Sequence, residues 1–213
     1  MTPRRRLALR AALALLAGAI ALPAAQAQHK AAPVVIVGDS ISAAYGLAAG
    51  SGWVDLLAAR LKELRYPQRV INASITGDTT AGGRARLPTL LAQHRPGVVV
   101  IELGGNDGLR GGDLKATREN LDAMVNAAQR AGAKVLLVGM RLPPNYGPAY
   151  TRDFEALFAT IAATRKVPLV PYFFDGFGER NELFQPDRIH PTAAAQPLLL
   201  ETVWPKLQPL LQR

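Results

Sequence analysis

The segment Val34-Val35-Ile36-Val37-Gly38-Asp39-Ser40 places four β-branched residues directly before a glycine and two polar residues. β-Branched side chains favour extended backbone, and an unbroken apolar run is typical of a strand that is buried on both faces. Further runs of this kind follow along the chain, at residues 70–72, 98–103, 135–138 and 167–170. The sequence therefore predicts five short, buried strands.

Helical patterns separate these strands and close the chain, at residues 53–64, 84–93, 114–131, 150–164 and 193–211. Buried strands that alternate with helices are typical of a parallel sheet with helices on either side. We therefore expect an α/β protein: a three-layer α/β/α sandwich around a five-stranded parallel sheet, doubly wound and flavodoxin-like. In this fold, ligands bind at the carboxyl ends of the strands.

The amino terminus has the pattern of an export signal. Four arginines lie within the first ten residues, and an uncharged apolar run covers residues 13–22. Pro23 ends this run, and Ala25-Gln26-Ala27 offers the small residues that a signal peptidase recognises. A single membrane anchor is the alternative, but the run is shorter than the roughly 20 residues that span a bilayer. We predict a signal peptide over residues 1–27, one domain over residues 28–213, and a periplasmic or secreted protein.

The charge and the cysteine content exclude several classes of protein. The chain has 213 residues, with 25 Lys and Arg against 16 Asp and Glu, and its formal charge of +9 falls to +5 without the predicted signal. The remaining basic residues are scattered singly, which argues against binding of nucleic acid. The chain contains no cysteine, so it has neither disulfides nor a lipidated cysteine. We expect a small-molecule partner and no stable membrane insertion after cleavage, and the sequence holds no signal for the oligomeric state.

Ser40 comes directly after the first predicted strand, where its hydroxyl would face the ligand crevice. The sequence lacks the second glycine of the G-x-S-x-G elbow that is typical of α/β-hydrolases. A turn serine or a helix N-cap is the alternative for an isolated Gly-Asp-Ser. A serine hydroxyl needs a base to act as a nucleophile at neutral pH. Ser40 is therefore a candidate nucleophile only if a base lies beside it.

Three histidines are available as that base: His29, His94 and His190. His29 would lie at the new amino terminus, and His94 precedes the third strand, at the end of the sheet opposite the crevice. His190 lies on the loop before the last helix, with Asp187 three residues earlier. A carboxylate at that spacing can accept a hydrogen bond from the ring and fix its tautomer, although D-x-x-H alone also suits a solvated loop. Elimination leaves His190 as the predicted base.

Acyl transfer also needs hydrogen-bond donors for the oxyanion, each worth about 3 to 4 kcal/mol in the transition state. Gly77 follows the second predicted strand, where the absence of a side chain lets its backbone N–H approach a ligand. Asn106 follows the third strand after two glycines, with its amide directed at the crevice. Ordinary turns are the alternative at both places. Their joint position at successive strand ends favours one site over separate turns.

These motifs resemble those of the SGNH (GDSL-type) hydrolases, and within that family the bacterial periplasmic thioesterases and lysophospholipases. The resemblance covers nearly all of the predicted mature chain and rests on residues 70–80, 104–111, 141–147, 189–191 and 195–197, together with Gly38-Asp39-Ser40. It implies a catalytic triad of Ser40, Asp187 and His190. It also implies an oxyanion hole made by the backbone N–H groups of Ser40 and Gly77 and the side chain of Asn106.

The resemblance further implies hydrolysis of acyl-CoA thioesters, lysophospholipids and aryl or alkyl esters, without a metal or a cofactor. Leu109, Leu142, Pro143 and Tyr146 follow the third and fourth strands and are the candidate substrate-binding residues of an acyl groove, although capping of the core would explain them equally well. A carbohydrate acetyl esterase on the same scaffold is one alternative function. A non-catalytic periplasmic lipid-binding protein is the other.

Overall fold

The computed structural model describes residues 31–212, so the predicted signal peptide and His29 lie outside the described residues. Five parallel strands form one sheet in the order β2-β1-β3-β4-β5. The strands are β1 (Val34–Gly38), β2 (Val70–Asn72), β3 (Val98–Glu102), β4 (Lys134–Val138) and β5 (Leu169–Val170). This order is that of the flavodoxin-like doubly wound sheet. The predicted fold class is confirmed.

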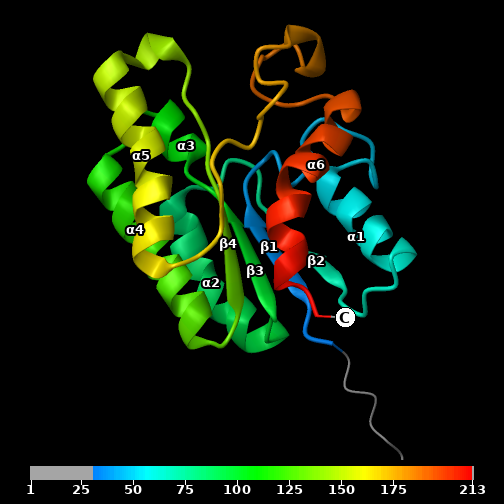
Figure 1. The fold of residues 1–213 in the computed structure, drawn as a ribbon. Coiled ribbons are helices and arrows are strands. Elements are labelled where there is room, and N and C mark those ends of the chain that lie inside the picture. Colours follow the sequence, from blue (N-terminus) through cyan, green and yellow to red (C-terminus); the bar gives the residue numbers. More distant parts are fainter. Residues whose placement is uncertain (1–30, 213) are drawn as a thin grey trace, which may run out of the picture.

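Helices cover both faces of the sheet and make the outer layers of the sandwich (Figure 1). One face carries α2 (Thr80–His94), α4 (Leu114–Arg130) and α5 (Pro148–Arg165), and the other carries α1 (Trp53–Glu63) and α6 (Gln196–Leu207). The short helix α3 (Gly105–Leu109) follows β3 at the carboxyl end of the sheet. Single 3-10 turns lie at η1 (Pro144–Tyr146), η2 (Asn181–Leu183), η3 (Ala193–Ala195) and η4 (Gln208–Leu210).

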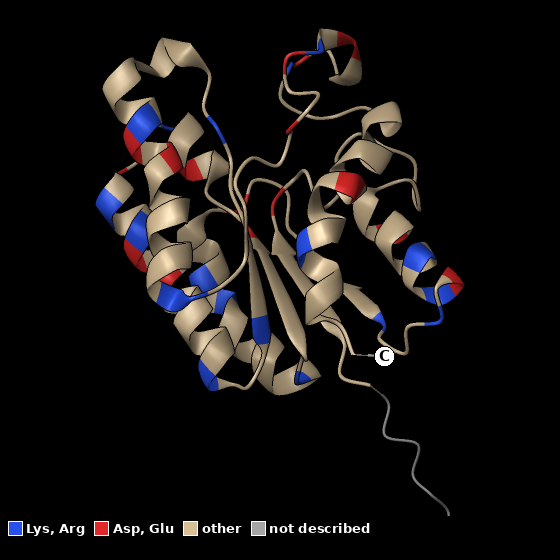
Figure 2. Cartoon of the chain, viewed as in Figure 1, with Lys and Arg blue, Asp and Glu red and all other residues tan. Residues whose placement is uncertain are grey.

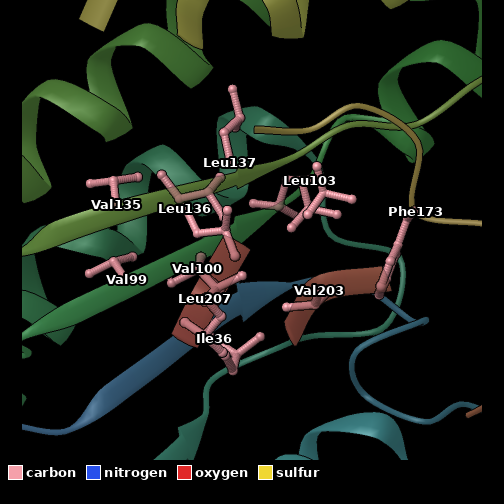
Figure 3. Packing of buried hydrophobic residues seen from close by; sticks show 14 of the residues in the cluster. Ile36, Val99, Val100, Leu103, Val135, Leu136, Leu137, Phe173, Val203 and Leu207 are labelled. Atoms are coloured by element: carbon pink, nitrogen blue, oxygen red, sulfur yellow. The ribbon is translucent and has the colours of Figure 1, made fainter. Parts of the chain in front are cut away.

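The core lies between the sheet and these helices. Every residue of β1 and β3 is buried, as the unbroken apolar runs predict for central strands. Figure 3 shows side chains from β1, β3 and β4 in one cluster with Val203 and Leu207 of α6. At about 25 cal/mol per Å² of apolar surface, this burial is the main force that holds the layers together.

The observed helices differ from the predicted ones at the start of α2, at α3, which was not predicted, and at the last helix. Helix α2 begins four residues before the predicted residue 84, because Thr79 accepts a hydrogen bond from Gly82 N at 3.3 Å and caps a first turn that contains two glycines. Glycine is a poor helix former, so the sequence pattern did not predict this first turn of α2. Gly83 is required there, since a Cβ would come within 2.3 Å of Leu103 Cδ1. The predicted last helix, 193–211, is α6 flanked by two 3-10 turns.

The register of the central strands brings three loops to one edge of the sheet. Gly38 at the end of β1 pairs with Glu102 at the end of β3, so the chain leaves both strands side by side. The loop after β2 lies at the same edge, because Ile75 N donates a hydrogen bond to the Gly38 carbonyl at the end of β1. Charged residues lie mainly on the outer helices and the loops, with no continuous basic stripe in this view (Figure 2). No helix within residues 31–212 has the length and apolarity of a membrane span.

Candidate active site

Ser40, His190 and Asp187 form a continuous hydrogen-bonded chain at the carboxyl end of the sheet. The Ser40 hydroxyl lies 2.8 Å from His190 Nε2, and His190 Nδ1 lies 2.7 Å from Asp187 Oδ2. When Nδ1 carries the proton it donates to Asp187, and Nε2 accepts from the Ser40 hydroxyl. Ser40 is only 7% exposed, two residues after the end of β1. The structure therefore brings together the three residues of the predicted triad.

The loop that carries His190 is fixed by the Asp187 carboxylate. Asp187 Oδ1 accepts hydrogen bonds from the backbone N–H groups of Ile189 and His190 at 2.9 and 3.0 Å. Desolvation is the largest single influence on the Asp187 carboxyl group and raises its pKa, but the bonds from the His190 N–H, the His190 ring and the Ile189 N–H together outweigh it and lower the pKa to about 2. Asp187 is therefore ionised at neutral pH and can hold a positive charge on His190.

Aromatic packing supports the same loop from beneath. Phe184 and Pro191 form an isolated antiparallel bridge that closes the loop around His190. Phe174 lies 5.3 Å from Phe184 and 5.6 Å from Phe177, measured between ring centroids. Phe173 is fully buried. These phenylalanines therefore pack together under the loop that carries His190.

Two backbone N–H groups beside Ser40 are free to donate. Gly77 has a φ of +78°, a left-handed conformation that glycine adopts at little cost, in the loop after β2. Within residues 31–212, neither the Gly77 N–H nor the Ser40 N–H donates a hydrogen bond to another residue. Free donors at the carboxyl end of a parallel sheet suit an anionic oxygen.

Asn106 lies in α3 and not in the ordinary turn that was its alternative. Gly104 caps α3 with a φ of +117°, which only glycine tolerates readily. Asn106 Nδ2 lies 3.1 Å from Asp39 Oδ2 and 3.0 Å from the Asp78 carbonyl oxygen, and donates to both. Asp107 of the same helix accepts from Thr80 N at 2.9 Å and so ties α3 to the start of α2. Asn106 is thus held rigidly between the loops after β1 and β2.

Asp39 makes two different contacts with its two carboxylate oxygens. Its Oδ1 accepts from Ile41 N at 3.0 Å, as a turn-fixing residue would, but its Oδ2 orients Asn106. Burial raises the pKa of Asp39 to about 6. Burial, and next the charge of Asp39, hold the pKa of the neighbouring Glu102 well above its usual range. This acid pair could not be predicted from the sequence, because β3 has the pattern of an apolar strand with one carboxylate at its end.

Tyr45 and Gln185 were also missed from the sequence. The Tyr45 ring lies 4.6 Å from the His190 ring between centroids, tilted by 44°. Gln185 Nε2 donates to the Tyr45 carbonyl at 2.8 Å and to the Pro191 carbonyl at 3.2 Å. The Gln185 N–H donates to the His190 carbonyl at 2.7 Å. Gln185 thus joins the serine loop to the histidine loop, a contact between residues 140 positions apart that no local pattern reveals.

A cavity of about 500 Å³ opens beside the triad. Ser40, Asn106 and His190 line it, together with three of the four predicted substrate-binding residues, namely Leu109, Leu142 and Pro143. Tyr146 does not line this cavity, and its hydroxyl donates to the Leu109 carbonyl at 2.7 Å. His94 ends α2, at the opposite end of the sheet from this cavity, as expected. The mainly apolar wall suits an acyl chain.

Comparison with known proteins identifies the arrangement. Residues 36–197 match the model of the GDSL-like lipase/acylhydrolase family. The chain belongs to this family. The GDSL-like chain is 54% identical to Esterase TesA of Pseudomonas aeruginosa, over 92% of its own length and 98% of that protein. It is 41% identical to thioesterase 1/protease 1/lysophospholipase L1 of Escherichia coli K12, over 84% of each.

A solved structure supports the same assignment. The psychrotrophic esterase EstA from Pseudoalteromonas sp., in a form inhibited by monoethylphosphonate, superimposes on this GDSL-like chain with a TM-score of 0.80 and 39% identity. The match covers 84% of this chain and 97% of that one. The fold and family membership therefore agree, and the protein is a hydrolase.

Proposed function

We propose that this hydrolase cleaves ester and thioester bonds of acyl lipids through an acyl-enzyme on Ser40. The observation that carries the proposal is the Ser40–His190–Asp187 chain, which opens directly onto the mainly apolar cavity. A free serine hydroxyl is a poor nucleophile, and a neutral imidazole 2.8 Å away is placed to take its proton. The names of the relatives, which include an esterase, a thioesterase and a lysophospholipase, agree with this substrate class.

The proposed acylation step follows from the geometry. His190 Nε2 takes the Ser40 proton as Oγ attacks the acyl carbonyl carbon, and Asp187 stabilises the imidazolium that forms. The carbonyl oxygen gains the negative charge and lies against the N–H groups of Ser40 and Gly77 and the amide of Asn106. Both N–H bonds of Asn106 are engaged in the free enzyme, so one is shared with the oxyanion as a three-centre bond.

The same residues then complete the acyl-enzyme and hydrolyse it. His190 gives its proton to the departing alcohol or thiol as the tetrahedral intermediate collapses, which leaves the acyl group on Ser40. A water molecule then loses a proton to His190 and attacks the acyl carbon. The second tetrahedral intermediate collapses to release the carboxylic acid, and His190 returns its proton to the departing Ser40 oxygen. No step needs a group beyond those of the chain, the substrate and water.

The test is to label the purified protein with a serine-directed phosphonate and locate the adduct by peptide mass. We expect the adduct on Ser40, and a fall in kcat of at least about 1,000-fold for Ser40→Ala, His190→Ala and Asp187→Asn. Asn106→Ala should lower kcat by about 100-fold or more without a matching rise in KM. An adduct elsewhere, or full esterase activity in Ser40→Ala, would reject the proposal.

The substrate class is tested by comparing acyl-CoA, lysophosphatidylcholine, p-nitrophenyl esters and acetylated xylan. We expect long acyl esters and thioesters to exceed the acetylated polysaccharide in kcat/KM, because a wall of leucine and proline buries alkyl chains. Leu109→Ala and Leu142→Ala should lower activity on long chains more than on short ones. An equal drop at all chain lengths would reject the acyl groove, and a preference for acetylated xylan would favour the carbohydrate esterase.

We propose that this hydrolase acts in the periplasm or outside the cell as a single domain, after cleavage near Ala27. The basic start, the short apolar run and the small residues at 25–27 support this location. Fractionation of a bacterium that produces the full chain, with amino-terminal sequencing of the product, tests it. Recovery of the uncleaved chain from the membrane would favour the anchor instead.

A further inference from the structure

Arg188 lies between Asp187 and His190 and has an uncommon backbone conformation. Its φ is +57°, in the left-handed region that non-glycine residues rarely occupy. Arg65, Arg95 and Lys166 also have positive φ, but each lies at the end of a helix, where that conformation closes the last turn, and Ala44 has a positive φ in the turns that follow Ser40. Arg188 ends no helix. A strained residue within a catalytic loop points to a role for its side chain.

The surrounding turn holds Arg188 in this conformation. The Arg188 N–H donates to the Gln185 carbonyl at 2.8 Å, and the Asp187 carboxylate binds the two N–H groups that follow. Glycine would fit the same turn with less strain. The side chain of Arg188 is therefore not needed to form the turn.

Arg188 lines the same cavity as Ser40, Asn106 and His190, and its charge is unpaired there. Its guanidinium makes no hydrogen bond or ion pair with any residue between 31 and 212. The other arginines nearby are engaged. Arg141 pairs with Glu155 at 3.4 Å, and Arg110 donates to the Gly77 carbonyl at 3.2 Å.

Three of the remaining charged residues on the cavity wall, Arg141, Glu155 and Glu179, act on Tyr172. Arg141 lies over the Tyr172 ring at 4.6 Å, and Glu155 and Glu179 act electrostatically on its hydroxyl. Asp39 is buried and bonded to Asn106. At the end of the cavity next to His190, Arg188 thus supplies the positive charge, and Asp187 is already bound to the histidine.

The reaction places the leaving group at this end. His190 returns its proton to the departing oxygen or sulfur, so that atom must lie near Nε2. Residues beside His190 therefore meet the part of the substrate that departs. Arginine presents a planar fork of N–H donors that binds phosphate oxygens in pairs.

We propose that Arg188 is a specificity-determining residue that binds a phosphate group on the leaving alcohol or thiol. The inference rests on the proposed acyl hydrolase function. Phosphate occurs both in CoA-type thiols and in glycerophosphate-type alcohols. The Arg188 guanidinium can bind the phosphate oxygens of either leaving group.

The experiment uses two substrate pairs that differ in phosphate but share the acyl chain. One pair is decanoyl-CoA and the decanoyl thioester of N-acetylcysteamine, and the other is decanoyl-lysophosphatidic acid and monodecanoylglycerol. The kcat/KM ratio of charged to neutral substrate is measured for wild type, Arg188→Ala, Arg188→Gly, Arg188→Lys and Arg188→Glu. Arg180→Ala is the matched control, because Arg180 lies on the same segment but pairs with Glu182 and does not line the cavity.

We expect Arg188→Ala and Arg188→Gly to lower the charged-to-neutral ratio about tenfold, mainly through KM. Arg188→Lys should keep most of the ratio, Arg188→Glu should lower it further, and Arg180→Ala should leave it within twofold of wild type. Raising the ionic strength should shrink the difference between wild type and Arg188→Ala. A loss in one pair alone identifies which phosphate-bearing class Arg188 selects.

An unchanged ratio in Arg188→Ala for both pairs, or an equal fall in Arg180→Ala, would overturn the inference while the hydrolase function stands. Wild-type protein that hydrolyses none of the four substrates would reject the proposed function and this inference with it. Melting temperatures of all variants confirm that the comparison is between folded proteins.

Discussion

Asp39 connects the nucleophile loop to Asn106 at the scale of single residues. It is 2% exposed, and its carboxyl group titrates near pH 6 in the folded protein instead of in its ordinary acid range. An acid with a raised pKa favours folding below its unfolded pKa, and this contribution is lost as the pH rises through the folded value. The buried acid therefore makes the protein less stable at neutral pH than at mildly acid pH.

We predict that Asp39→Asn, which cannot ionise, removes this pH dependence. Its amide nitrogen cannot accept one of the two hydrogen bonds that Asp39 accepts, so the variant should be less stable than wild type near pH 4, and its free energy of unfolding should rise relative to wild type by up to about 3 kcal/mol between pH 4 and pH 8. Urea unfolding of both proteins across this range measures the difference. Parallel curves for the two proteins would show that Asp39 does not titrate between pH 4 and 7.

The Tyr45 ring should support the positive charge that His190 gains during acylation. An aromatic face beside a cation contributes about 0.5 to 2 kcal/mol. We predict that Tyr45→Leu lowers kcat about tenfold with little change in KM, whereas Tyr45→Phe stays near wild type. The bond from Gln185 to the Tyr45 carbonyl belongs to the backbone, so it survives both changes. Equal kcat values for the leucine and phenylalanine variants would assign the ring to packing alone.

The sequence predicted the three residues of the hydrogen-bonded chain Ser40–His190–Asp187, but not the contacts that position them. Ser40, His190 and Asn106 could be found because few residue types suit their chemistry and strand ends converge at one edge. The sequence pattern around Asp39 is typical of a turn, that around Gln185 is typical of a polar loop, and that around Tyr45 indicates a surface aromatic residue. Their contacts depend on how loops fold in three dimensions, which short-range patterns do not encode.

At the scale of elements, α3 controls the position of Asn106. Gly108 is buried in this helix against α5 and the loop after β4. A Cβ at this position would lie 2.7 Å from Leu142 Cδ2 and 2.8 Å from Phe154 Cε2. The helix can therefore approach its neighbours this closely only with glycine at position 108.

We predict that Gly108→Ala destabilises the protein by about 1 to 3 kcal/mol, because it overpacks this contact. The melting temperature should fall by several degrees. The kcat should fall as well, because a displaced α3 moves Asn106 away from the oxyanion. Thermal unfolding and esterase assays measure both. Unchanged melting temperature and kcat would show that Leu142 and Phe154 adjust without moving the helix.

Strand and helix prediction succeeded where apolar periodicity was strong and failed where glycines obscured it. The five strands were located to within two residues at each end, since central strands of a parallel sheet are uniformly apolar. The start of α2 and all of α3 contain glycine pairs that read as turns. Both exceptions adjoin the site, where close backbone approach requires glycine despite its poor helix propensity.

For the whole molecule, we predict that residues 28–213 fold and act without the preceding 27. The sheet, its helices and every residue of the site lie within the described part of the chain. The shortened protein should unfold in one cooperative transition and match the kcat of the processed enzyme. Calorimetry and esterase assays test this. Separate transitions, or loss of activity, would contradict the assignment of one domain.

Ser40 and His190 are 150 residues apart in sequence, and this separation has a consequence for biosynthesis. The last strand ends at Val170, so a nascent chain already contains the entire sheet before Asp187 and His190 are synthesised. Such an incomplete chain carries the serine without its base. The proposed hydrolysis therefore needs the loop that carries Asp187 and His190 as well as the sheet, and a protease that clips this loop would silence the enzyme while leaving the five strands intact.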